Sequence, residues 1–432
     1  MMMGEAKTGR SGSHVVVVGA GIVGVTVALE LRRRGYEVSV LTSAEAGSVD
    51  AASYGNAGWL NPGSVVPHSM PGMWKKLPGY LLDTSGPLRI RIAALPGAWS
   101  WLLKFVACGA TKARVQRIAA ALRPFLNDSV ARHIALATAA GVAELIEGKG
   151  LLVVYPDEQA FAADALGWQL RRANGVCWTT LDRAGLLALC PGLSEDYRYG
   201  ALIEGGGHCT DPGAYVTALA QYAQRRGVRF LTTRVDGFAA ASGVLRGVSH
   251  AGGVIPCEKA VVAAGIATRE LALALGDRIP LFSERGYHVQ VPAMAGAPSV
   301  PVMMSDRKFG ITPMRAGLRA AGQVEFAPRG ASPDWRRARV LLDCLAKGLP
   351  NMTARNRNAV QRWWGNRPST PDCLPVIGFS PSVSGVLYAS GHGHLGLASA
   401  PWTAELVGRM ADGEHVAEAA PYDPARFRHF RI

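Results

Sequence analysis

The most regular pattern of apolar positions lies near the start of the chain. Four consecutive valines begin at Val15 and lead into a glycine-rich turn. Apolar residues then recur at the spacing of one helix face as far as Gly35, and a second valine-bearing segment spans residues 37–41. Runs of β-branched residues are typical of parallel strands buried on both faces, and a 3.6-residue spacing is typical of an amphipathic helix. The segment therefore predicts a strand, a helix and a second strand.

Other periodic segments follow along the chain. Between residues 70 and 207 the sequence is rich in Trp, Pro and Arg, whereas the last third returns to an apolar run, a glycine turn and a helical pattern. This alternation predicts an α/β protein of two domains, at least one of them discontinuous. Strands are predicted at 228–235, 260–264, 286–291, 310–325 and 385–390, and helices at 112–147, 215–227 and from Leu395 onward.

Composition excludes several classes of protein. The chain has 432 residues, of which 49% are hydrophobic, so it can bury a sizeable core. Its 46 basic and 32 acidic residues give a formal charge of +14, which favours anionic substrates or surfaces. The basic residues are scattered and accompany no nucleic-acid motif, so we expect no nucleic-acid partner. No GxSxG or HExxH motif is present, which gives hydrolase activity little support.

Cysteine content and hydropathy bear on location. Seven cysteines without a CxxC pair argue against a disulfide framework or a zinc site and favour a reducing cytoplasm. The longest apolar stretch, 15–29, is shorter than the roughly 20 residues that span a bilayer. We expect a cytoplasmic protein, with peripheral contact at the inner face of the membrane as an option. That option rests on a cluster of aromatic and basic residues, which core tryptophans explain equally well: Trp74, Lys75, Lys76, Arg89, Arg91, Trp99 and Trp101.

The glycine-rich turn contains a dinucleotide fingerprint. Gly19, Gly21 and Gly24 form a GxGxxG motif between the predicted strand and helix. The first glycine permits the turn, the second admits a pyrophosphate, and the third allows close packing of helix and strand. The free amides at the start of the helix attract the pyrophosphate charge. The residues expected to bind the cofactor here therefore include Ala20, Ile22 and Val23.

The acidic residue that usually holds the ribose is absent. Thr42 and Ser43 stand at the end of the second strand, and the nearest carboxylate is Glu45. No arginine directly follows Thr42, so the sequence does not favour NADP. We expect Thr42 or Ser43, or Glu45 reaching back, to contact the ribose.

Beyond these features, the chain resembles the D-amino acid dehydrogenase branch of the FAD-dependent D-amino acid oxidase superfamily. The motifs that carry the resemblance occur in order, almost from end to end: GAGIVG (19–24), SYGNAGWLNPG (53–63), PLRIRI (87–92), GYHVQVP (286–292), NRPSTPDCLPVIG (366–378) and GHGHLG (391–396). The resemblance implies a discontinuous Rossmann-like FAD-binding domain at 1–65, 208–280 and 360–432. It also implies an α+β substrate domain at 66–207 and 281–359, built on a mixed antiparallel sheet.

The resemblance also implies two further FAD-contacting loops. Ser53, Asn56, Ala57 and Gly58 form a small, polar loop that can run beside a flavin ring without steric conflict. The GHG turn precedes a helix whose amides could stabilise negative charge on the reduced flavin. His392 and His394 have no carboxylate partner nearby, so a metal site is not expected. The expected contacts are completed by Gly391, His392, Gly393, Leu395, Val235, Ala264 and Gly265.

Three residues are candidates for binding the substrate. The resemblance implies that Arg367, in a Gly-x-Arg-Pro motif, pairs with the substrate carboxylate, and a guanidinium offers a planar pair of donors suited to it. Tyr287 could add a hydroxyl to the same carboxylate, and either Tyr287 or His288 could face the flavin. Arg319 could be structural. His68, His133 and His208 have no companion at catalytic spacing and are most simply structural.

The expected activity is oxidation of the amine-bearing carbon of a small amino acid, as in a D-amino acid dehydrogenase. A D-proline or D-hydroxyproline dehydrogenase and a glycine or sarcosine oxidase are alternatives in the same superfamily. A non-catalytic flavin-binding interaction protein is an alternative of another class. A basic nucleic-acid binder with a structural Rossmann unit is a third. The residues leave open whether the electrons pass to oxygen, a quinone or a cytochrome.

Overall fold

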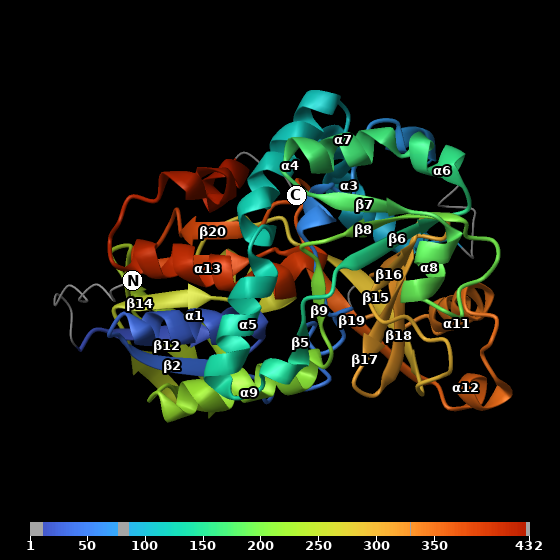
Figure 1. Cartoon of the computed structure of the whole chain (residues 1–432). Coiled ribbons are helices and arrows are strands. Elements are labelled where there is room, and N and C mark those ends of the chain that lie inside the picture. Colours follow the sequence, from blue (N-terminus) through green and yellow to red (C-terminus); the bar gives the residue numbers. More distant parts are fainter. Residues whose placement is uncertain (1–11, 77–85, 329, 429–432) are drawn as a thin grey trace.

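The computed structural model describes residues 12–76, 86–328 and 330–428, which form two lobes built on separate sheets (Figure 1). One lobe holds a six-stranded sheet with the order β10-β2-β1-β14-β21-β20. All neighbouring strands in it are parallel except β20 and β21. These strands are β1 (His14–Val18), β2 (Glu37–Thr42), β10 (Arg229–Thr232), β14 (Lys259–Val262), β20 (Val376–Phe379) and β21 (Val386–Ser390).

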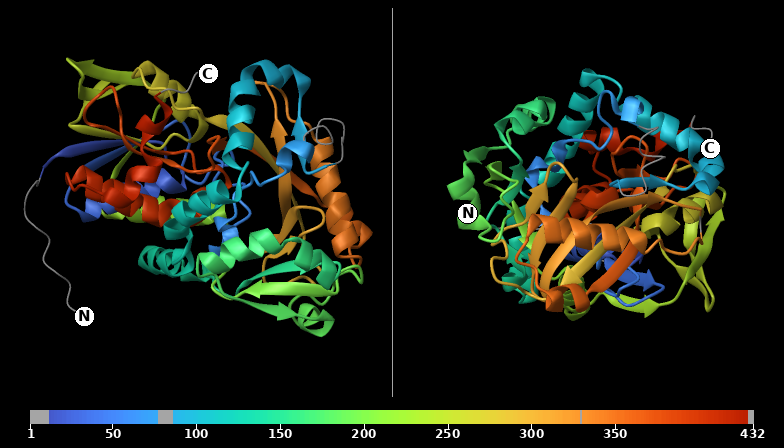
Figure 2. Two further views of the ribbon diagram at one scale, coloured as in Figure 1. Left: turned by 90° about the horizontal axis from the view of Figure 1, so that it is seen from above. Right: turned by 90° about the vertical axis from the view of Figure 1, so that its right-hand side faces the viewer.

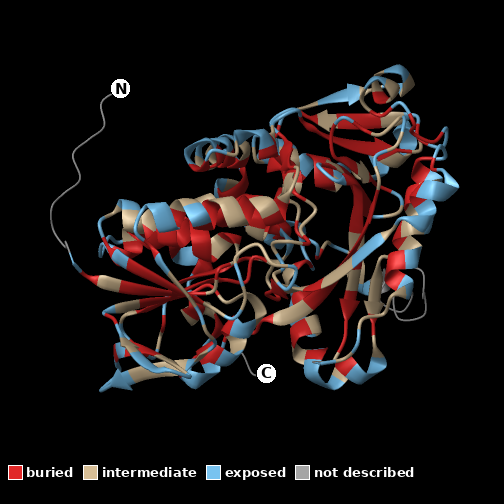
Figure 3. Cartoon of the chain, turned by 90° about the horizontal axis from the view of Figure 1, so that it is seen from below, coloured by how far each residue is buried: buried red, intermediate tan, exposed pale blue. Residues whose placement is uncertain are grey.

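Both faces of this sheet are covered, as the four valines predict. Val15 and Val17 belong to a core that includes α1 (Ile22–Arg33) and α13 (Gly396–Ala411). Val16 and Val18 point to the other face and join a core with a three-stranded antiparallel sheet. Figure 3 shows the strands of this lobe buried between the two layers. The covering sheet consists of β11 (Val235–Ala241), β12 (Val244–His250) and β13 (Gly253–Pro256).

The second lobe contains a nine-stranded mixed sheet. One of its faces packs against α11 (Arg336–Gly348), and Figure 2 shows this helix lying along the sheet. Along the order β19-β15-β18-β17-β16-β6-β8-β7, with β4 beside β18, the strands are β19 (Gln361–Ser369), β15 (Phe282–Val291), β18 (Gly317–Phe326), β17 (Phe309–Met314), β16 (Val302–Met304), β6 (Leu151–Tyr155), β8 (Tyr199–Ile203), β7 (Trp178–Leu181) and β4 (Leu88–Ile90).

Shorter elements connect the two lobes. A small sheet with the order β3-β9-β5 lies between them (Figure 1) and consists of β3 (Trp59–Leu60), β9 (Gly207–Cys209) and β5 (Ile146–Glu147). The remaining α-helices are α3 (Leu95–Cys108), α4 (Lys112–Leu126), α5 (Ser129–Ala140), α6 (Glu158–Ala163), α7 (Ala165–Ala173), α8 (Arg183–Leu189), α9 (Pro212–Arg225), α10 (Thr268–Ala274) and α12 (Ala354–Asn358).

The predicted α/β class and the initial strand-helix-strand unit are confirmed, but several boundaries differ. The pattern at 112–147 divides into α4 and α5 and ends at Gly141, which has a left-handed conformation. The pattern at 310–325 is a hairpin of β17 and β18, which turns at Gly317 with a φ of +123°. The strand predicted at 228–235 ends at Thr232, and Val235 begins β11.

One strand lies outside the lobe to which its segment was assigned. Residues 361–369 fall in the segment at 360–432 that was expected in the FAD-binding domain. In the structure they form β19, which pairs with β15 in the nine-stranded sheet. The motif that contains Arg367 therefore lies on the sheet of the second lobe.

Candidate active site

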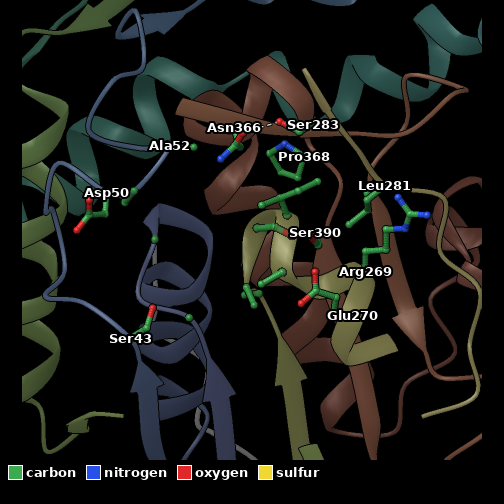
Figure 4. Close-up of a pocket in the computed structure, with 18 of the residues that line it drawn as sticks. Ser43, Asp50, Ala52, Arg269, Glu270, Leu281, Ser283, Asn366, Pro368 and Ser390 are labelled. Atoms are coloured by element: carbon green, nitrogen blue, oxygen red, sulfur yellow. Dashed lines mark hydrogen bonds between the residues drawn. The ribbon is translucent and has the colours of Figure 1, made fainter. Parts of the chain in front are cut away.

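A large cavity opens at the carboxyl ends of the parallel strands in the six-stranded sheet. Its volume is about 1380 Å³, and its walls come from both lobes (Figure 4). The carboxyl edge of a parallel sheet is where α/β proteins bind nucleotides. Of the predicted cofactor contacts, those that line this cavity are Gly19, Ala20, Gly21, Ile22, Val23, Thr42, Ser43, Ser53, Asn56, Val235, Ala264, Gly265, His392 and Gly393.

The glycine fingerprint has the close backbone packing that its sequence predicts. Gly19 has a φ of +108°, and its N–H donates to the carbonyl of Leu41 at 2.8 Å. A Cβ atom on Gly19 would lie 2.5 Å from the carbonyl oxygen of Ala263. A Cβ atom on Gly24 would collide with the carbonyl oxygen of Gly19. Both positions therefore require glycine for the turn to lie against β14 and α1.

The start of α1 points its amides toward the cavity. Gly21 is the N-cap and supplies no side-chain cap, and the first turn of α1 carries no acidic residue. The N–H of Ile22 donates to the hydroxyl of Ser53 at 3.0 Å, which ties the predicted flavin loop to the helix. Free amides at a helix start favour an anion such as a pyrophosphate.

The structure distinguishes among the three residues that were predicted to contact the ribose. The Thr42 hydroxyl donates to the carbonyl of Ala44 at 2.7 Å, so it is already engaged. Ser43 and Glu45 line the cavity, and Figure 4 shows Ser43 at the end of its strand. These two residues are therefore the better candidates to bind the ribose hydroxyls.

This geometry gives a testable difference among the three residues. We expect Ser43→Ala and Glu45→Gln each to raise the Kd for FAD by up to about tenfold, because a hydrogen bond contributes about 0.5–1.5 kcal/mol. Thr42→Val should change the Kd less than about twofold, because its hydroxyl bonds to Ala44. Titration of apoprotein with FAD, followed by flavin fluorescence, measures all three. A larger loss in Thr42→Val than in the other two variants would show that the Thr42 hydroxyl binds the cofactor.

Five predicted contacts lie behind the cavity wall. Gly24 packs α1 on the turn, Gly58 donates its N–H to the Asn56 side chain at 2.8 Å, and the Ala57 carbonyl accepts from Thr312 at 2.9 Å. Gly391 and Leu395 line a second, smaller cavity. These residues shape the flavin loops from behind.

The first cavity fits FAD. It combines the glycine turn, the helix start and polar loops from both lobes. In the adjacent smaller cavity, the Ser369 hydroxyl is buried without a hydrogen-bond partner among the described residues, and it lies near Gly393, which lines both cavities. A buried unpaired hydroxyl is costly, and a flavin carbonyl or amide could satisfy it. The backbones of Gly19 to Val23 would hold the pyrophosphate, and Ser53, Asn56 and Gly393 would flank the isoalloxazine.

The sheet of the second lobe presents Arg367 on the same side as the flavin loop. Opposite residues of two antiparallel strands share a face, and here Trp363 pairs with His288, Gly365 with Gly286, and Arg367 with Glu284. The Arg367 guanidinium lies across Gly286, where a Cβ atom would collide with it. Its Nη1 donates a long hydrogen bond to the carbonyl of Gln323 at 3.4 Å.

Partial burial and a neighbouring carboxylate set the electrostatics of Arg367. Desolvation lowers the pKa of its guanidinium, and the nearby Glu284 carboxylate partly offsets that effect. Arginine nevertheless keeps its charge in proteins. The guanidinium fills the space above Gly286, and the Trp363 ring fills the space above Gly365. Among the described residues the guanidinium makes only the long contact with Gln323, so its other donors can bind a carboxylate.

His288 lies on this face, whereas Tyr287 does not. The His288 ring stacks on Trp363 with centroids 5.1 Å apart, and its Nδ1 lies 3.1 Å from the carbonyl of Gly55. Burial lowers the His288 pKa to about 3, so the ring is neutral. His288 thus holds the flavin loop and carries no charge.

The suggestion that Tyr287 binds the substrate carboxylate is not supported by its position. Tyr287 lies on the opposite face of β15, because side chains alternate along a strand. Its hydroxyl donates to Glu325 at 2.6 Å and accepts from the Asp334 N–H at 2.9 Å. The structure therefore brings Arg367 and His288 together but leaves Tyr287 in the core beneath α11.

Arg319 has a defined structural contact. Its Nη1 donates to the carbonyl of Asn56 at 2.6 Å and to that of Tyr54 at 3.1 Å. Burial lowers its pKa to about 10. Arg319 therefore anchors the flavin loop to β18, which agrees with the structural alternative considered for it.

A pair of histidines was missed in the sequence. The rings of His68 and His394 stack with centroids 4.1 Å apart and an interplanar angle of 12°. Both residues are exposed, and both line the smaller cavity. Desolvation by the surrounding protein nevertheless lowers the pKa of both rings, which favours the neutral form. They are far apart in the chain, and no spacing rule connects them.

Comparison with known proteins agrees with this site. The chain is 42% identical, over 96% of its length and 99% of the relative, to a D-amino-acid oxidase of Bradyrhizobium diazoefficiens. It is 32% identical, over 93% of its length and 92% of the relative, to a D-amino acid dehydrogenase of Cereibacter sphaeroides. The solved glycine oxidase of Geobacillus kaustophilus has the same fold, with a TM-score of 0.75 at 22% identity, and the match covers 96% of this chain and 99% of that one.

The family comparison covers nearly the whole chain. A family described as DAO, FAD dependent oxidoreductase, matches residues 14–410, from the first strand of the nucleotide-binding sheet to the end of α13. This range includes the fingerprint, the flavin loop and the Arg367 motif. The protein is therefore a FAD-dependent oxidoreductase that belongs to the DAO family.

Proposed function

We propose that this protein oxidises the amine-bearing carbon of a small D-amino acid to an imine, which then hydrolyses to a 2-oxo acid. The observation that carries the proposal is the half-buried Arg367 guanidinium, which lies over Gly286 on the face of the flavin loop and makes one long hydrogen bond among the described residues. A planar guanidinium is suited to a carboxylate. The names of the relatives, D-amino-acid oxidase and D-amino acid dehydrogenase, support the choice of substrate class.

The chain's own residues supply orientation. Arg367, placed over Gly286, binds the carboxylate. His288 and Arg319 hold the flavin loop in place. FAD, when bound, supplies the electron acceptor for the chemical step. Fixing the reacting carbon in one orientation accounts for much of the expected rate.

A turnover assay with matched enantiomers tests the proposal. Holoenzyme is incubated with D- and L-amino acids, D-proline, glycine and sarcosine, and the 2-oxo acid or pyrroline product is quantified. We expect a D-amino acid to be the best substrate. A preference for proline analogues, glycine or sarcosine would select the alternatives within the family. Failure of all amines, in protein that carries FAD, would instead favour a non-catalytic flavin-binding role.

The same assay addresses the electron acceptor. Relatives of this chain are named both oxidase and dehydrogenase. Dehydrogenase activity would pass electrons to a quinone or cytochrome, and oxidase activity would pass them to oxygen. Measuring oxygen uptake beside dye reduction, with the same amino acid, distinguishes the two.

We also propose a cytoplasmic location with peripheral contact at the inner face of the membrane. All seven cysteines are free, which suits a reducing compartment. Ile92, in the 3-10 turn just before α3, and Trp99 and Leu103 on α3 are exposed at 79%, 61% and 52%. Exposed apolar residues on a basic protein are typical of contact with an anionic lipid surface. Among the described residues no single helix is long and apolar enough to span a bilayer, although the bent pair Ile92–Cys108 and Lys112–Ala140 passes that test together.

Two residues of the original aromatic and basic cluster do not belong to this surface. Trp101 is buried and stacks on Phe105 with ring centroids 5.2 Å apart. The Nε of Arg91 donates to the buried Glu325 carboxylate at 2.6 Å. The exposed face of α3 therefore carries the membrane proposal.

This surface predicts measurable binding to vesicles. Wild-type protein should co-sediment with vesicles that contain anionic phosphatidylserine, less so at high salt, because the electrostatic part is screened. The double substitution Ile92→Ser and Trp99→Ser should lower the bound fraction at least threefold. Val254→Ser, which removes an exposed apolar residue from β13, serves as the control. Equal sedimentation of all three proteins would refute the membrane contact.

A further inference from the structure

A small chamber lies on the face of the second-lobe sheet that carries Arg367. Its volume is about 30 Å³, close to the share of one water molecule in the liquid, so it admits a group the size of an ammonium. Its walls come from β15 and β19, from the GHG turn and from the loop after η1 (Pro62–Val65). Its polar lining includes Glu284, Ser369, Thr370, His68, His392 and His394.

Among the residues that the structure describes, Glu284 is the only carboxylate that lines the chamber. Desolvation lowers the pKa of His68, His392 and His394, which favours the neutral form of these neighbouring imidazoles. Burial likewise raises the pKa of the Cys373 thiol, which therefore stays protonated. A cationic group in this chamber would find its counter-charge at Glu284.

Glu284 and Arg367 are neighbours that do not touch. They are direct partners in the β15–β19 ladder, where opposite side chains start about 5 Å apart. No ion pair within 4.0 Å joins either of them to an oppositely charged group among the residues the structure describes. Arg367 instead lies across Gly286. Glu284 is only 5% exposed. Buried charged groups that are not paired are costly unless a ligand of opposite charge binds them.

An α-amino acid zwitterion carries one charge to pair with each of these two side chains. Its carboxylate matches the guanidinium of Arg367, and its ammonium matches the carboxylate of Glu284. We propose that Glu284 binds the substrate ammonium, so that the site selects amino acids over carboxylic acids with the same side chain. The inference rests on the proposed function and deepens it by assigning a residue that binds the substrate's amino group.

Comparing two ligands in a Glu284→Gln variant tests this assignment. The ligands are the D-amino acid that wild-type holoenzyme oxidises best and the carboxylic acid that differs from it only by lacking the amino group. The dissociation constant of the acid is measured from the change it causes in the flavin spectrum. The dissociation constant of the amino acid is measured from the concentration at which its anaerobic bleaching of the flavin saturates. If Glu284 binds the ammonium, the variant should bind the amino acid at least about tenfold more weakly. It should bind the acid as tightly or more tightly, because Arg367 loses a neighbouring carboxylate.

A matched control removes a buried carboxylate from the other face of the same sheet. Glu325→Gln should not produce opposite changes for the two ligands, because Glu325 bonds to Tyr287 and Arg91 away from the chamber. If Glu284 only balances the charge of Arg367, both ligands should bind Glu284→Gln more tightly, which would overturn the proposal. Equally weaker binding of both ligands would overturn the proposal too, since that result indicates a structural role for Glu284.

The remaining outcomes are also decisive. If Glu284→Gln does not retain FAD, Glu284→Asp is used instead, because it keeps the charge but places it one methylene further away. That variant should then bind the amino acid more weakly but the carboxylic acid unchanged. If no amino acid bleaches wild-type flavin, the proposed function fails. In that case the spectral titration is made with D-alanine and propanoate as unreactive ligands. Weaker D-alanine binding in the variant, with propanoate unchanged or tighter, would still support zwitterion binding, and any other pattern would contradict it.

Discussion

Replacing Arg367 with alanine should lower kcat/KM for the amino-acid substrate by at least about 100-fold. Charge-assisted hydrogen bonds contribute about 1.5–3 kcal/mol each, and a bidentate pair has two. Arg367→Lys should still lose about tenfold or more, because an ammonium cannot reproduce the planar fork. KM should rise in both variants. The flavin spectrum should not change, because Arg367 is assigned to substrate and does not line the FAD cavity.

Steady-state kinetics of purified holoenzyme measure this prediction, with Arg362→Lys as the control. Arg362 lies on the same strand but is exposed, and it contacts the Trp335 ring on the other side of the sheet. Its substitution should change kcat/KM less than about twofold. Turnover by Arg367→Ala within about twofold of wild type would mean that another group holds the carboxylate.

Gly19→Ala should abolish stable FAD binding. The φ of +108° is strained for any L side chain, and the added Cβ would press on the Ala263 carbonyl. Backbone strain and overpacking each cost about 1–3 kcal/mol. The turn would have to move away from β14, which displaces the amides that hold the pyrophosphate. The purified variant should be colourless and should melt at a lower temperature than wild type.

The ratio of flavin to protein absorbance, together with Tm, measures this effect. Gly237→Ala is the matched control, because a Cβ atom there meets nothing within 4 Å and its φ is not positive. That variant should retain FAD and its Tm. Full FAD content with an unchanged Tm in Gly19→Ala would contradict the role of the turn.

Local signals explain what the sequence predicted well. The valine run, the glycine spacing and the helix period lie within residues 14–42, and the structure forms the strand, turn and helix from them. The flavin loop and the GHG turn were identified by motif, and Ser53, Asn56, His392 and Gly393 line the cavity. These elements depend on contacts that short segments largely determine.

Tertiary pairing explains what the sequence could not decide. Tyr287 and His288 are adjacent, and only the packing of α11 on one face of β15 determines which of them meets the flavin loop. Glu284 and Arg367 become neighbours through a strand pairing across 83 residues, and no motif marks Glu284. The His68–His394 stack joins segments even further apart. Such contacts depend on strand register and lobe packing, which single-sequence patterns do not encode.

Anaerobic titration of the purified holoenzyme tests the central claim most directly. A small D-amino acid is added stepwise without oxygen or any other acceptor, and flavin absorbance and 2-oxo acid are measured together. We expect the oxidised flavin band to disappear, with one 2-oxo acid formed per flavin reduced, while the L-enantiomer leaves the band in place. A flavin band that persists with every amino acid, in protein that carries a full complement of FAD, would contradict the assignment of this site to amino-acid oxidation.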